Sequence, residues 1–228
     1  MKLNGNYKHG MQKYRKLNEG AEAVIYASNF LGIDAIIKYR AAKDYREESL
    51  DKMLRYQRTK KEAKILSVAS QVVSAPKVLF LEKDRIFMQR IKGTNLLTIL
   101  QANTGVIEKN ANLQLQADKN LFSKIGSALA VLHGNNIVHG DFTPANILVD
   151  KNSISIIDFG LADMSQMIED KAVDLLLMKR AITKEQYAAF LDAYKNNYSK
   201  AHEIIKRLEK IERRGRYQER TLASTTEK

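Results

Sequence analysis

The chain has 228 residues, of which 44% are hydrophobic and none is cysteine, and its formal net charge is +12. This length suits one two-lobed domain or two small ones, and the apolar fraction can build a core, which argues against wholesale disorder. Without cysteine there are no disulfides, thiolate metal sites or cysteine catalysis, which fits a reducing compartment.

Targeting segments are also not expected from the sequence. No apolar run approaches the length needed to span a bilayer, and residues 1–14 lack the apolar core of a secretory signal. The strong positive charge leaves two interpretations open. One is a nucleic-acid or acidic partner, and the other is a solvated, lysine-rich surface.

The first part of the chain, residues 15–91, is expected to form short strands around one helix. Apolar, β-branched segments flank a turn at FLGID and a second turn at KDR. Between them, residues 50–70 contain strong helix formers and neither Gly nor Pro. The predicted strands are 24–30, 34–40, 77–82 and 85–91.

After Gly93 the pattern becomes mostly helical. Residues 116–136 place apolar side chains at helical spacing and end near Gly134. A hairpin is expected over residues 147–158, followed by two helical stretches in residues 169–212. The predicted class is α+β with two lobes. A small β-rich N-lobe with one long helix covers 1–91, a reduced helical C-lobe covers 92–212, and a basic C-terminal tail covers 213–228.

Polar residues with a distinctive spacing follow the long C-lobe helix. In IVHGDFTPANILVD, residues 137–150, Asp141 follows His139 by two residues and precedes Asn146 by five. The hairpin then leads to Asp158 in the sequence Asp-Phe-Gly. Phosphoryl transfer from ATP needs a carboxylate near the attacking oxygen and hard oxygen ligands for Mg²⁺. We therefore predict Asp141 as the catalytic base or orienting acid, and Asn146 and Asp158 as metal ligands.

The N-lobe offers weaker matches to the same chemistry. Lys38 ends the strand AIIK and is predicted as a catalytic residue that contacts the α- and β-phosphates of ATP. Glu62 is its expected ion-pair partner, with Glu47 and Glu48 as alternatives at the helix start.

A further set is predicted to bind the nucleotide. The segment NEGAEAVIY stands where a glycine-rich loop is expected, but Gly20 is the single glycine of the three. Fewer glycines mean a stiffer loop with less backbone access to the phosphates. Apolar residues after the loop and on the later strands are placed to line an adenine slot, or to form ordinary core. The predicted ATP-binding residues are Gly20, Ala21, Glu22, Ile25, Ile36, Lys38, Glu62, Met88, Gln89 and Ile91.

Together, HGDFTPANIL, IIDFG, AIIK and GAEA resemble the small atypical Ser/Thr kinase of the KEOPS complex, a relative of the RIO kinases, over nearly the whole chain. The resemblance implies a protein-kinase-like fold, ATP and Mg²⁺ as cofactors, and cytoplasmic placement. It also implies a kinase or ATPase that supports threonylcarbamoyl-adenosine formation in transfer RNA. The implied partners are the large catalytic threonylcarbamoyl-transferase subunit, other KEOPS subunits and tRNA, with no membrane.

Features of ordinary protein kinases are missing. No APE motif occurs, and only LADMSQMI separates Gly160 from the helical EDKAVDLLLMKR. Without this peptide platform, water, the protein itself or a partner is the expected phosphoryl acceptor. Two alternatives remain open, a small-molecule kinase of the choline or aminoglycoside type and a non-catalytic RNA-binding module on a kinase scaffold.

Two surfaces are expected to meet partners. The helical region 169–180 is predicted to dock the large subunit, with Lys171 and Lys179 as contacts. In the tail, Gly215 is expected to end the last helix, leaving a mobile basic arm. The arm is either a solvated terminus or a site of phosphate-backbone contact with tRNA. The predicted RNA-binding residues are Arg213, Arg214 and Arg216.

Overall fold

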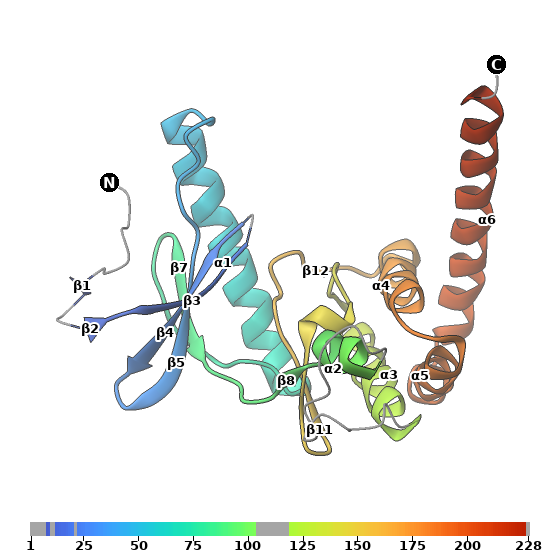
Figure 1. The fold of residues 1–228 in the computed structure, drawn as a ribbon, viewed down its shortest axis with the longest axis horizontal. Coiled ribbons are helices and arrows are strands. Elements are labelled where there is room, and N and C mark those ends of the chain that lie inside the picture. The colour runs from blue at the N-terminus through green and yellow to red at the C-terminus, as the bar shows by residue number, and fades with distance from the viewer. Residues whose placement is uncertain (1–7, 10–11, 21, 104–118, 227–228) are drawn as a thin grey trace. The chain divides into compact units, whose positions relative to one another are not determined.

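Two units make up the fold of the computed structural model, which describes residues 8–9, 12–20, 22–103 and 119–226 (Figure 1). One unit comprises Met1–Gly93 and Ser155–Leu161, and the other comprises Thr94–Ile154 and Ala162–Lys228. The first is rich in strands and the second in helices, so the predicted α+β class is confirmed. Within the described ranges, no helix combines the length and apolar character that crossing a membrane requires.

The first unit is built on a five-stranded antiparallel sheet in the order β3-β4-β5-β7-β6. Its strands coincide within a few residues with the segments predicted from β-branched and apolar composition. Two further short strands pair with each other near the N-terminus. The strands are β1 (Lys8–His9), β2 (Gln12–Lys13), β3 (Arg15–Glu19), β4 (Val24–Phe30), β5 (Ile33–Tyr39), β6 (Val78–Leu81) and β7 (Arg85–Gln89).

Strand register divides the sheet into two different faces. Ile25 lies opposite Lys38 across β4 and β5, and Lys38 in turn lies opposite Ile86 of β7. Because side chains alternate along a strand, these three residues share one face. Residues of the opposite parity, Ile37 and Phe87, pack in an apolar cluster on the other face. The cationic site is therefore carried by one face of the sheet and the aromatic core by the other.

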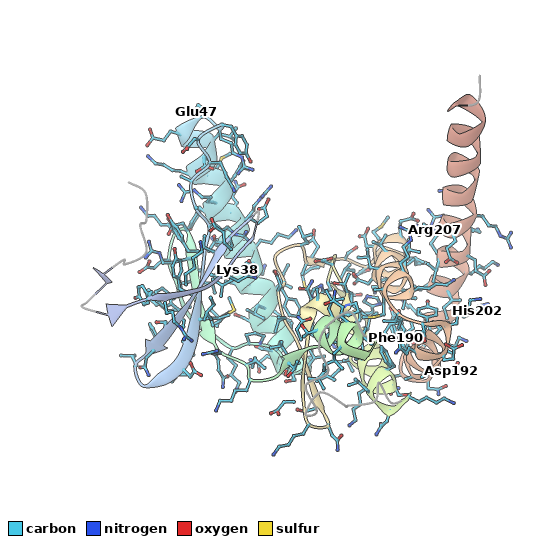
Figure 2. The ribbon with its side chains drawn as sticks, viewed as in Figure 1. Lys38, Glu47, Phe190, Asp192, His202 and Arg207 are labelled. Atoms are coloured by element: carbon cyan, nitrogen blue, oxygen red, sulfur yellow. The ribbon has the colours of Figure 1, made fainter. Side chains whose placement is uncertain are left out.

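The long helix α1 (Glu48–Val72) begins at a carboxylate cap. Glu47 accepts hydrogen bonds from the backbone N–H groups of Ser49 (2.9 Å) and Leu50 (2.8 Å) (Figure 2). The Ser49 hydroxyl and these N–H groups lower the pKa of Glu47 to about 2, so the cap is charged at neutral pH. An anionic cap favours this end of the helix because the N–H groups there lack partners within the helix.

The segment Ser155–Leu161 belongs to the first unit although it follows the helical residues in sequence. The backbone N–H of Ile156 donates to the carbonyl oxygen of Ser74 (2.9 Å), and the Ser74 and Ser155 hydroxyls are 2.8 Å apart. These bonds tie the Asp-Phe-Gly segment to the chain that follows α1. The sequence pattern did not indicate this pairing, because it joins residues about eighty positions apart.

The second unit is mainly helical. Leu121, Ile125, Leu129 and Leu132, which were predicted to share a helix face, are buried. Where two helical stretches were expected after residue 169, the structure has three helices. Its elements are β8 (Thr94–Asn95), α2 (Leu96–Asn103), α3 (Lys119–Gly134), β9 (Ile137–Val138), β10 (Ile147–Asp150), β12 (Asp163–Met164), α4 (Ile168–Ala181), α5 (Lys184–Asn197) and α6 (Ala201–Thr226). Strand β11 (Ser153–Ile156) crosses from this unit into the first.

The expectation that Gly215 ends the last helix is wrong. Helix α6 continues through Gly215 to Thr226 (Figure 1). A single interior glycine costs a helix only about 1 kcal/mol relative to alanine, and the flanking Glu and Arg residues are good helix formers. The basic tail is thus an extension of a helix whose first half packs through Ile204 and Leu208, both buried.

Helices α3 and α5 approach closely at Gly126. A Cβ atom placed on Gly126 would lie 2.0 Å from the carbonyl oxygen of Phe190, a buried residue of α5. Backbone cannot yield as the end of a flexible side chain can, so the contact requires glycine. This close approach brings the two helices together around the core of the second unit.

We predict that Gly126→Ala destabilises the protein by about 2–3 kcal/mol or more, because α5 must move away from α3. Urea unfolding monitored by circular dichroism measures the loss. Gly134→Ala is the matched control, since a Cβ there meets nothing within 4 Å. It should be neutral or slightly stabilising. Equal stability of the two variants would contradict the close-packing interpretation.

Candidate active site

A buried ion pair joins β5 to α1. The ammonium of Lys38 donates to Oε1 of Glu62 (2.7 Å), and the Glu62 side chain is only 2% exposed. The alternatives Glu47 and Glu48 lie at the start of the helix, where Glu47 serves as its cap. The Lys38 ammonium also donates to Oδ1 of Asp158 (2.6 Å), the acid of the Asp-Phe-Gly segment. One cation therefore holds two carboxylates that lie 96 residues apart in sequence.

A second cation, Arg40, lies on the same carboxylate. Its Nη2 atom donates to Oε2 of Glu62 at 2.6 Å, so each oxygen of Glu62 is bound by a different positive side chain. Arg40 is 4% exposed. The sequence interpretation missed this residue. Its position two residues after Lys38 in an alternating strand was the signal that could have found it.

Asp158 is held in an unusual backbone conformation. Its φ is +62°, in the left-handed region that few residues other than Gly, Asn and Asp adopt. Its Oδ1 also accepts a hydrogen bond from the backbone N–H of Gly160 (3.1 Å). A Cβ on Gly160 would lie 3.0 Å from that oxygen and 3.1 Å from the Lys38 ammonium. A side chain at residue 160 would therefore crowd both charged groups, which favours glycine there.

The other predicted nucleotide residues of this unit lie on the sheet face of Lys38, at the end of β7 and in the loop before β4. Ile25, Ile36 and Met88 share the sheet face that carries Lys38, according to their strand register. Gln89 ends β7, and Ile91 follows it half-buried. In the loop before β4, the N–H of Gly20 donates to Ala23 O (2.9 Å) and Glu22 is exposed. Ala21 lies outside the described residues.

In the second unit, the predicted catalytic loop folds back on itself. The Nδ2 atom of Asn146 donates both to the backbone carbonyl and to Oδ2 of Asp141, each at 2.8 Å. A short 3-10 helix, Pro144–Asn146, makes this return possible. Because the amide nitrogen is committed to Asp141, the amide oxygen is the atom of Asn146 that can serve as a metal ligand.

Asp174, in α4, fixes the start of this loop. Its Oδ2 accepts from the backbone N–H of His139 (2.8 Å), and its Oδ1 accepts from that of Gly140 (2.8 Å). Asp174 is 0% exposed. Gly140 has a φ of +77°, which favours glycine over the arginine that ordinary kinases carry at this place. No motif pointed to Asp174, since its partners lie 34 and 35 residues earlier.

The same carboxylate also contacts a buried histidine. His133 Nε2 lies 3.2 Å from Oδ2 of Asp174, and its Nδ1 lies 2.8 Å from the hydroxyl of Tyr194. Burial lowers the pKa of His133 below its ordinary value of 6.5, although the neighbouring carboxylate acts in the opposite direction. His133 is therefore neutral at pH 7 and acts as a hydrogen-bonding spacer between α3, α4 and α5.

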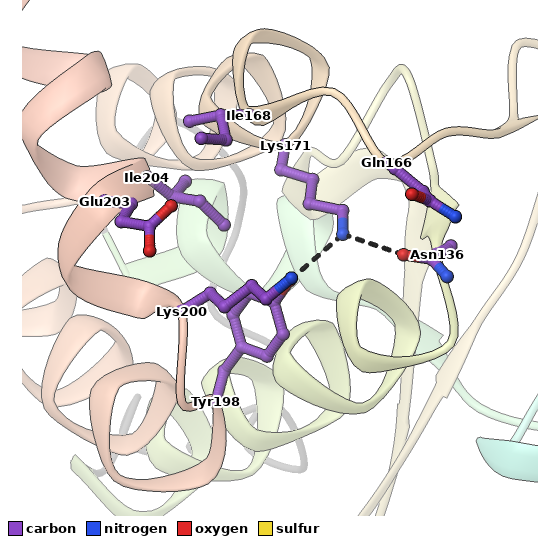
Figure 3. A pocket seen from close by; sticks show the side chains of 8 residues that line it. All are labelled: Asn136, Gln166, Ile168, Lys171, Tyr198, Lys200, Glu203 and Ile204. Carbon is purple, nitrogen blue, oxygen red and sulfur yellow. Dashed lines mark hydrogen bonds between the residues drawn. The ribbon is translucent and has the colours of Figure 1, made fainter.

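Lys171 of α4 is not the surface contact that the sequence suggested. It is 3% exposed, and its ammonium donates to His133 O (2.9 Å), Asn136 Oδ1 (3.2 Å) and Tyr198 OH (3.0 Å). Figure 3 shows the last two bonds at the edge of a small polar cavity. The long alkyl chain of Lys171 is buried in the unit, and its ammonium group makes three hydrogen bonds. Lys179, in contrast, is half-exposed and pairs with Glu212 (2.7 Å).

The protein kinase domain family matches residues 38–204 of the chain. The chain belongs to the protein kinase family. Its two-lobed, kinase-like α+β fold, predicted from the motifs, is confirmed by this match.

Individual relatives narrow the family further. The chain is 34% identical over 205 residues to a protein of Enterocytozoon bieneusi named "EKC/KEOPS complex subunit BUD32", covering 89% of this chain and 98% of the relative. A Methanocaldococcus jannaschii protein named "Probable bifunctional tRNA threonylcarbamoyladenosine biosynthesis protein" is 36% identical over 213 residues, or 89% of this chain. A Methanosphaera stadtmanae protein of the same name is 33% identical over 226 residues, or 94% of this chain.

These relatives differ in length. The chain spans 37% and 39% of the two proteins named as bifunctional, but 98% of the one named as a BUD32 subunit. The chain belongs to the group of small kinases typified by the BUD32 subunit, and the resemblance inferred from HGDFTPANIL and IIDFG is confirmed.

We predict that acidification destabilises the fold through His133. Its folded-state pKa lies below the unfolded value of 6.5, so below pH 6.5 the unfolded chain binds a proton that the folded chain does not. Its contribution is complete above pH 6.5 and is lost as the pH falls toward the folded-state pKa, at no more than about 1.4 kcal/mol per pH unit.

Urea unfolding at pH 7.5, 6.5 and 5.5 tests this prediction. His133→Gln keeps a donor that can reach Asp174 but removes the titrating group, so its stability should fall less steeply between pH 6.5 and 5.5. The variant can be less stable at every pH without affecting the comparison, because the slope is measured. An identical slope in both proteins would show that His133 is not the acid-sensitive group.

Proposed function

We propose that this chain is an ATP-dependent kinase or ATPase of the KEOPS type that supports threonylcarbamoyl-adenosine modification of tRNA. The observation that carries the proposal is the Lys38 ammonium bound at once to Glu62 and Asp158. Phosphoryl transfer by protein kinases requires a strand lysine paired with a helix glutamate, and an Asp-Phe-Gly aspartate that can hold Mg²⁺. Both acids lie here beside the same ammonium. The match to a protein named as a BUD32 subunit, over 89% of this chain and 98% of that protein, supports the biological assignment.

The residues of the first unit fit the binding of a nucleotide polyphosphate. Lys38 supplies a positive charge on the sheet face that also carries Ile25 and Ile36, two apolar residues suited to an adenine ring. Asp158, whose side chain is 53% exposed, presents a carboxylate beside that charge. We assign the phosphate contact to Lys38 and its orientation to Glu62.

In the second unit, we assign the acceptor-orienting role to Asp141. Its Oδ2 is bound by the Asn146 amide, so its Oδ1 is the atom suited to accept a proton from the attacking hydroxyl or water. Asn146 and Asp158 offer the hard oxygen donors that suit Mg²⁺. When bound, Mg²⁺ neutralises charge on the phosphates. Asp174 keeps Asp141 in position through the backbone of His139 and Gly140.

The acceptor is water, the protein itself or a partner protein rather than a free peptide. Seven residues, 161–167, connect Gly160 to helix α4, and no APE motif follows. This length is too short for the peptide platform of ordinary serine/threonine kinases. If the chain phosphorylates serine or threonine, we propose that the residue belongs to the chain itself or to a protein assembled with it.

The alternatives are less consistent with the chain. A small-molecule kinase of the choline or aminoglycoside type needs acidic groups for a cationic substrate, whereas α6 is strongly basic around Arg213 and Arg214. A non-catalytic RNA-binding module would not need Lys38, Asp141 and Asp158 together. The relatives' names also point away from small-molecule substrates.

We propose that the partners are the large threonylcarbamoyl-transferase subunit, other KEOPS subunits and tRNA, in the cytoplasm. Helix α4 remains the proposed docking region for the large subunit. Met167, Ile168 and Val173 are exposed apolar residues at its start and middle, and such residues suit a protein interface. Because Lys171 is buried, the docking contacts are assigned to these residues rather than to Lys171.

We predict that Asp158→Asn lowers ATP turnover by about two orders of magnitude or more, because it removes a carboxylate from the proposed metal site. Asn tolerates the positive φ at this position, so the fold should be retained. A coupled-enzyme ATPase assay with Mg²⁺ measures the loss, and thermal unfolding checks the fold. Asp192→Asn, at an exposed position of α5, is the matched control. Parental turnover in Asp158→Asn at an unchanged melting temperature would refute the proposed role.

A separate prediction concerns tRNA binding by α6. Arg213 and Arg214 are exposed, and Arg216 follows them on the same helix. Each phosphate contact contributes roughly 0.7 to 0.9 to the slope of log affinity against log salt. Replacing all three arginines with Gln should therefore lower the slope by about two to three units.

Salt titrations of tRNA affinity measure this slope. The control is a triple Gln variant at Lys60, Lys61 and Lys64, three exposed lysines of α1. It removes the same formal charge from another part of the chain, and its slope should remain close to the parent value. If both triple variants lowered the slope equally, the effect would come from net charge and not from contacts made by α6.

A further inference from the structure

Arg40 binds Glu62, and its position also suits contact with the phosphates of a nucleotide. It follows Tyr39, the last residue of β5, and Tyr39 lies opposite Val24, the first residue of β4 after the glycine-poor loop. Arg40 is therefore next to the loop that contains Glu22. Its backbone is fixed, because its N–H donates to the carbonyl of Asp84 (2.9 Å).

The guanidinium of Arg40 is not fully hydrogen-bonded. Nη2 donates to Glu62, but Nε is buried and has no hydrogen-bond partner within the described part of the chain. Nη1 lies 3.8 Å from Oε2 of Glu22, an ionic contact longer than a hydrogen bond. A buried donor without an acceptor is costly, so such a group in a native fold calls for a missing acceptor.

The local charges also leave room for an anion. Lys38 and Arg40 are both buried cations, and Glu62 is the buried acid that they share. The other acids near them, Asp158 and Glu22, have side chains 53% and 56% exposed. The buried trio therefore carries one net positive charge. The two carboxylates that outweigh it are half exposed, so solvent screens their charge.

Glu22 is held in place by cations. Arg58 of α1 donates to its Oε2 at 2.5 Å. Desolvation raises the pKa of Glu22, but the hydrogen bond from Arg58 and the charges of Arg58, Arg40 and Arg46 outweigh it and hold the pKa below its ordinary value. Glu22 is thus an anion at neutral pH. Because it is half exposed to solvent, its ion pairs are weak and can be exchanged for those of another anion.

We propose that Arg40 is a second phosphate-binding cation beside Lys38, and that the Glu22 carboxylate partners Arg40 and Arg58 until nucleotide phosphates displace it. This inference rests on the proposed ATP-dependent function and adds a binding residue and a competing carboxylate to it. Phosphate oxygens supply the acceptor that Nε lacks. A guanidinium can hold two phosphate oxygens at once, whereas an ammonium acts as a point charge.

Gly160 lies beside both cations. The Cβ position that Gly160 lacks is 3.1 Å from the Lys38 ammonium and 3.7 Å from Nη2 of Arg40. Both cations therefore lie against the backbone at Gly160, where a larger residue would crowd them.

Nucleotide affinities of the full chain test the proposal. Isothermal titration with Mg-ATP, Mg-ADP and adenosine separates the phosphate contribution from the adenine contribution. Arg40→Met should weaken Mg-ATP binding about ten- to a hundredfold while adenosine affinity stays within about twofold. Glu22→Gln should strengthen Mg-ATP binding by about two- to fivefold, because a competing anion is lost, and leave adenosine unchanged.

Two further variants keep the test decisive. Lys64→Met removes one positive charge from an exposed site on α1 and should leave all three affinities unchanged. Arg40→Lys keeps the charge but not Nε, so it should lie between the parent and Arg40→Met. If Arg40→Met does not fold, Arg40→Lys and Glu22→Gln still give the phosphate-specific comparison.

The outcomes are distinct. An equal loss of ATP and adenosine affinity in Arg40→Met would mean that Arg40 only supports the fold, and unchanged ATP affinity would remove it from the site. Weaker ATP binding in Glu22→Gln would overturn the displacement of Glu22. Each of these results leaves the proposed function intact. A parent chain that binds neither ATP nor adenosine would overturn the proposed function together with this inference.

Discussion

The buried carboxylate of Glu62 is the constraint on which the first unit depends. An ionised group that is 2% exposed is stable only when it is paired and hydrogen-bonded. Lys38, near the end of β5, and Arg40, the residue that follows β5, each bind one of its oxygens. A shift of α1 against this part of the sheet would therefore leave a buried charge without its partner. Lys38 then reaches Asp158, which extends the same network to the Asp-Phe-Gly segment.

In the second unit, the buried carboxylate of Asp174 has a similar role. Its two oxygens accept backbone N–H groups of consecutive residues, His139 and Gly140, and it also contacts the neutral ring of His133. A carboxylate with several donors holds a loop more rigidly than apolar contacts, because each bond has a preferred direction. In each unit, then, one buried acid from a helix holds a segment that carries predicted site residues.

The motifs predicted the candidate site residues better than the buried residues that hold them in place. Strand alternation, helix formers and the spacing of Asp141, Asn146 and Asp158 predicted the fold class and the candidate residues, because these signals are local. Asp174 and the pairing of Ser74 with Ser155 were missed because their partners are 34 to 81 residues away and no local pattern encodes such contacts. Arg40 was missed although its place two residues after Lys38 was a usable signal. The predicted end of α6 was wrong for a different reason. The energetic cost of one glycine in a helix is small compared with the helix propensity of the residues around it.

The way Glu62 is held also bears on how such a kinase can be controlled. A switch needs two arrangements that differ by only a few kcal/mol. Breaking a buried ion pair by removing one partner costs about 3–5 kcal/mol, and here Glu62 would have to leave two cations together. The Lys38–Glu62 pair is therefore a permanent part of the first unit and a poor on/off element. Exchangeable contacts are found instead at the half-exposed carboxylates, Glu22 and Asp158, where an arriving anion or cation competes with partners that solvent already screens.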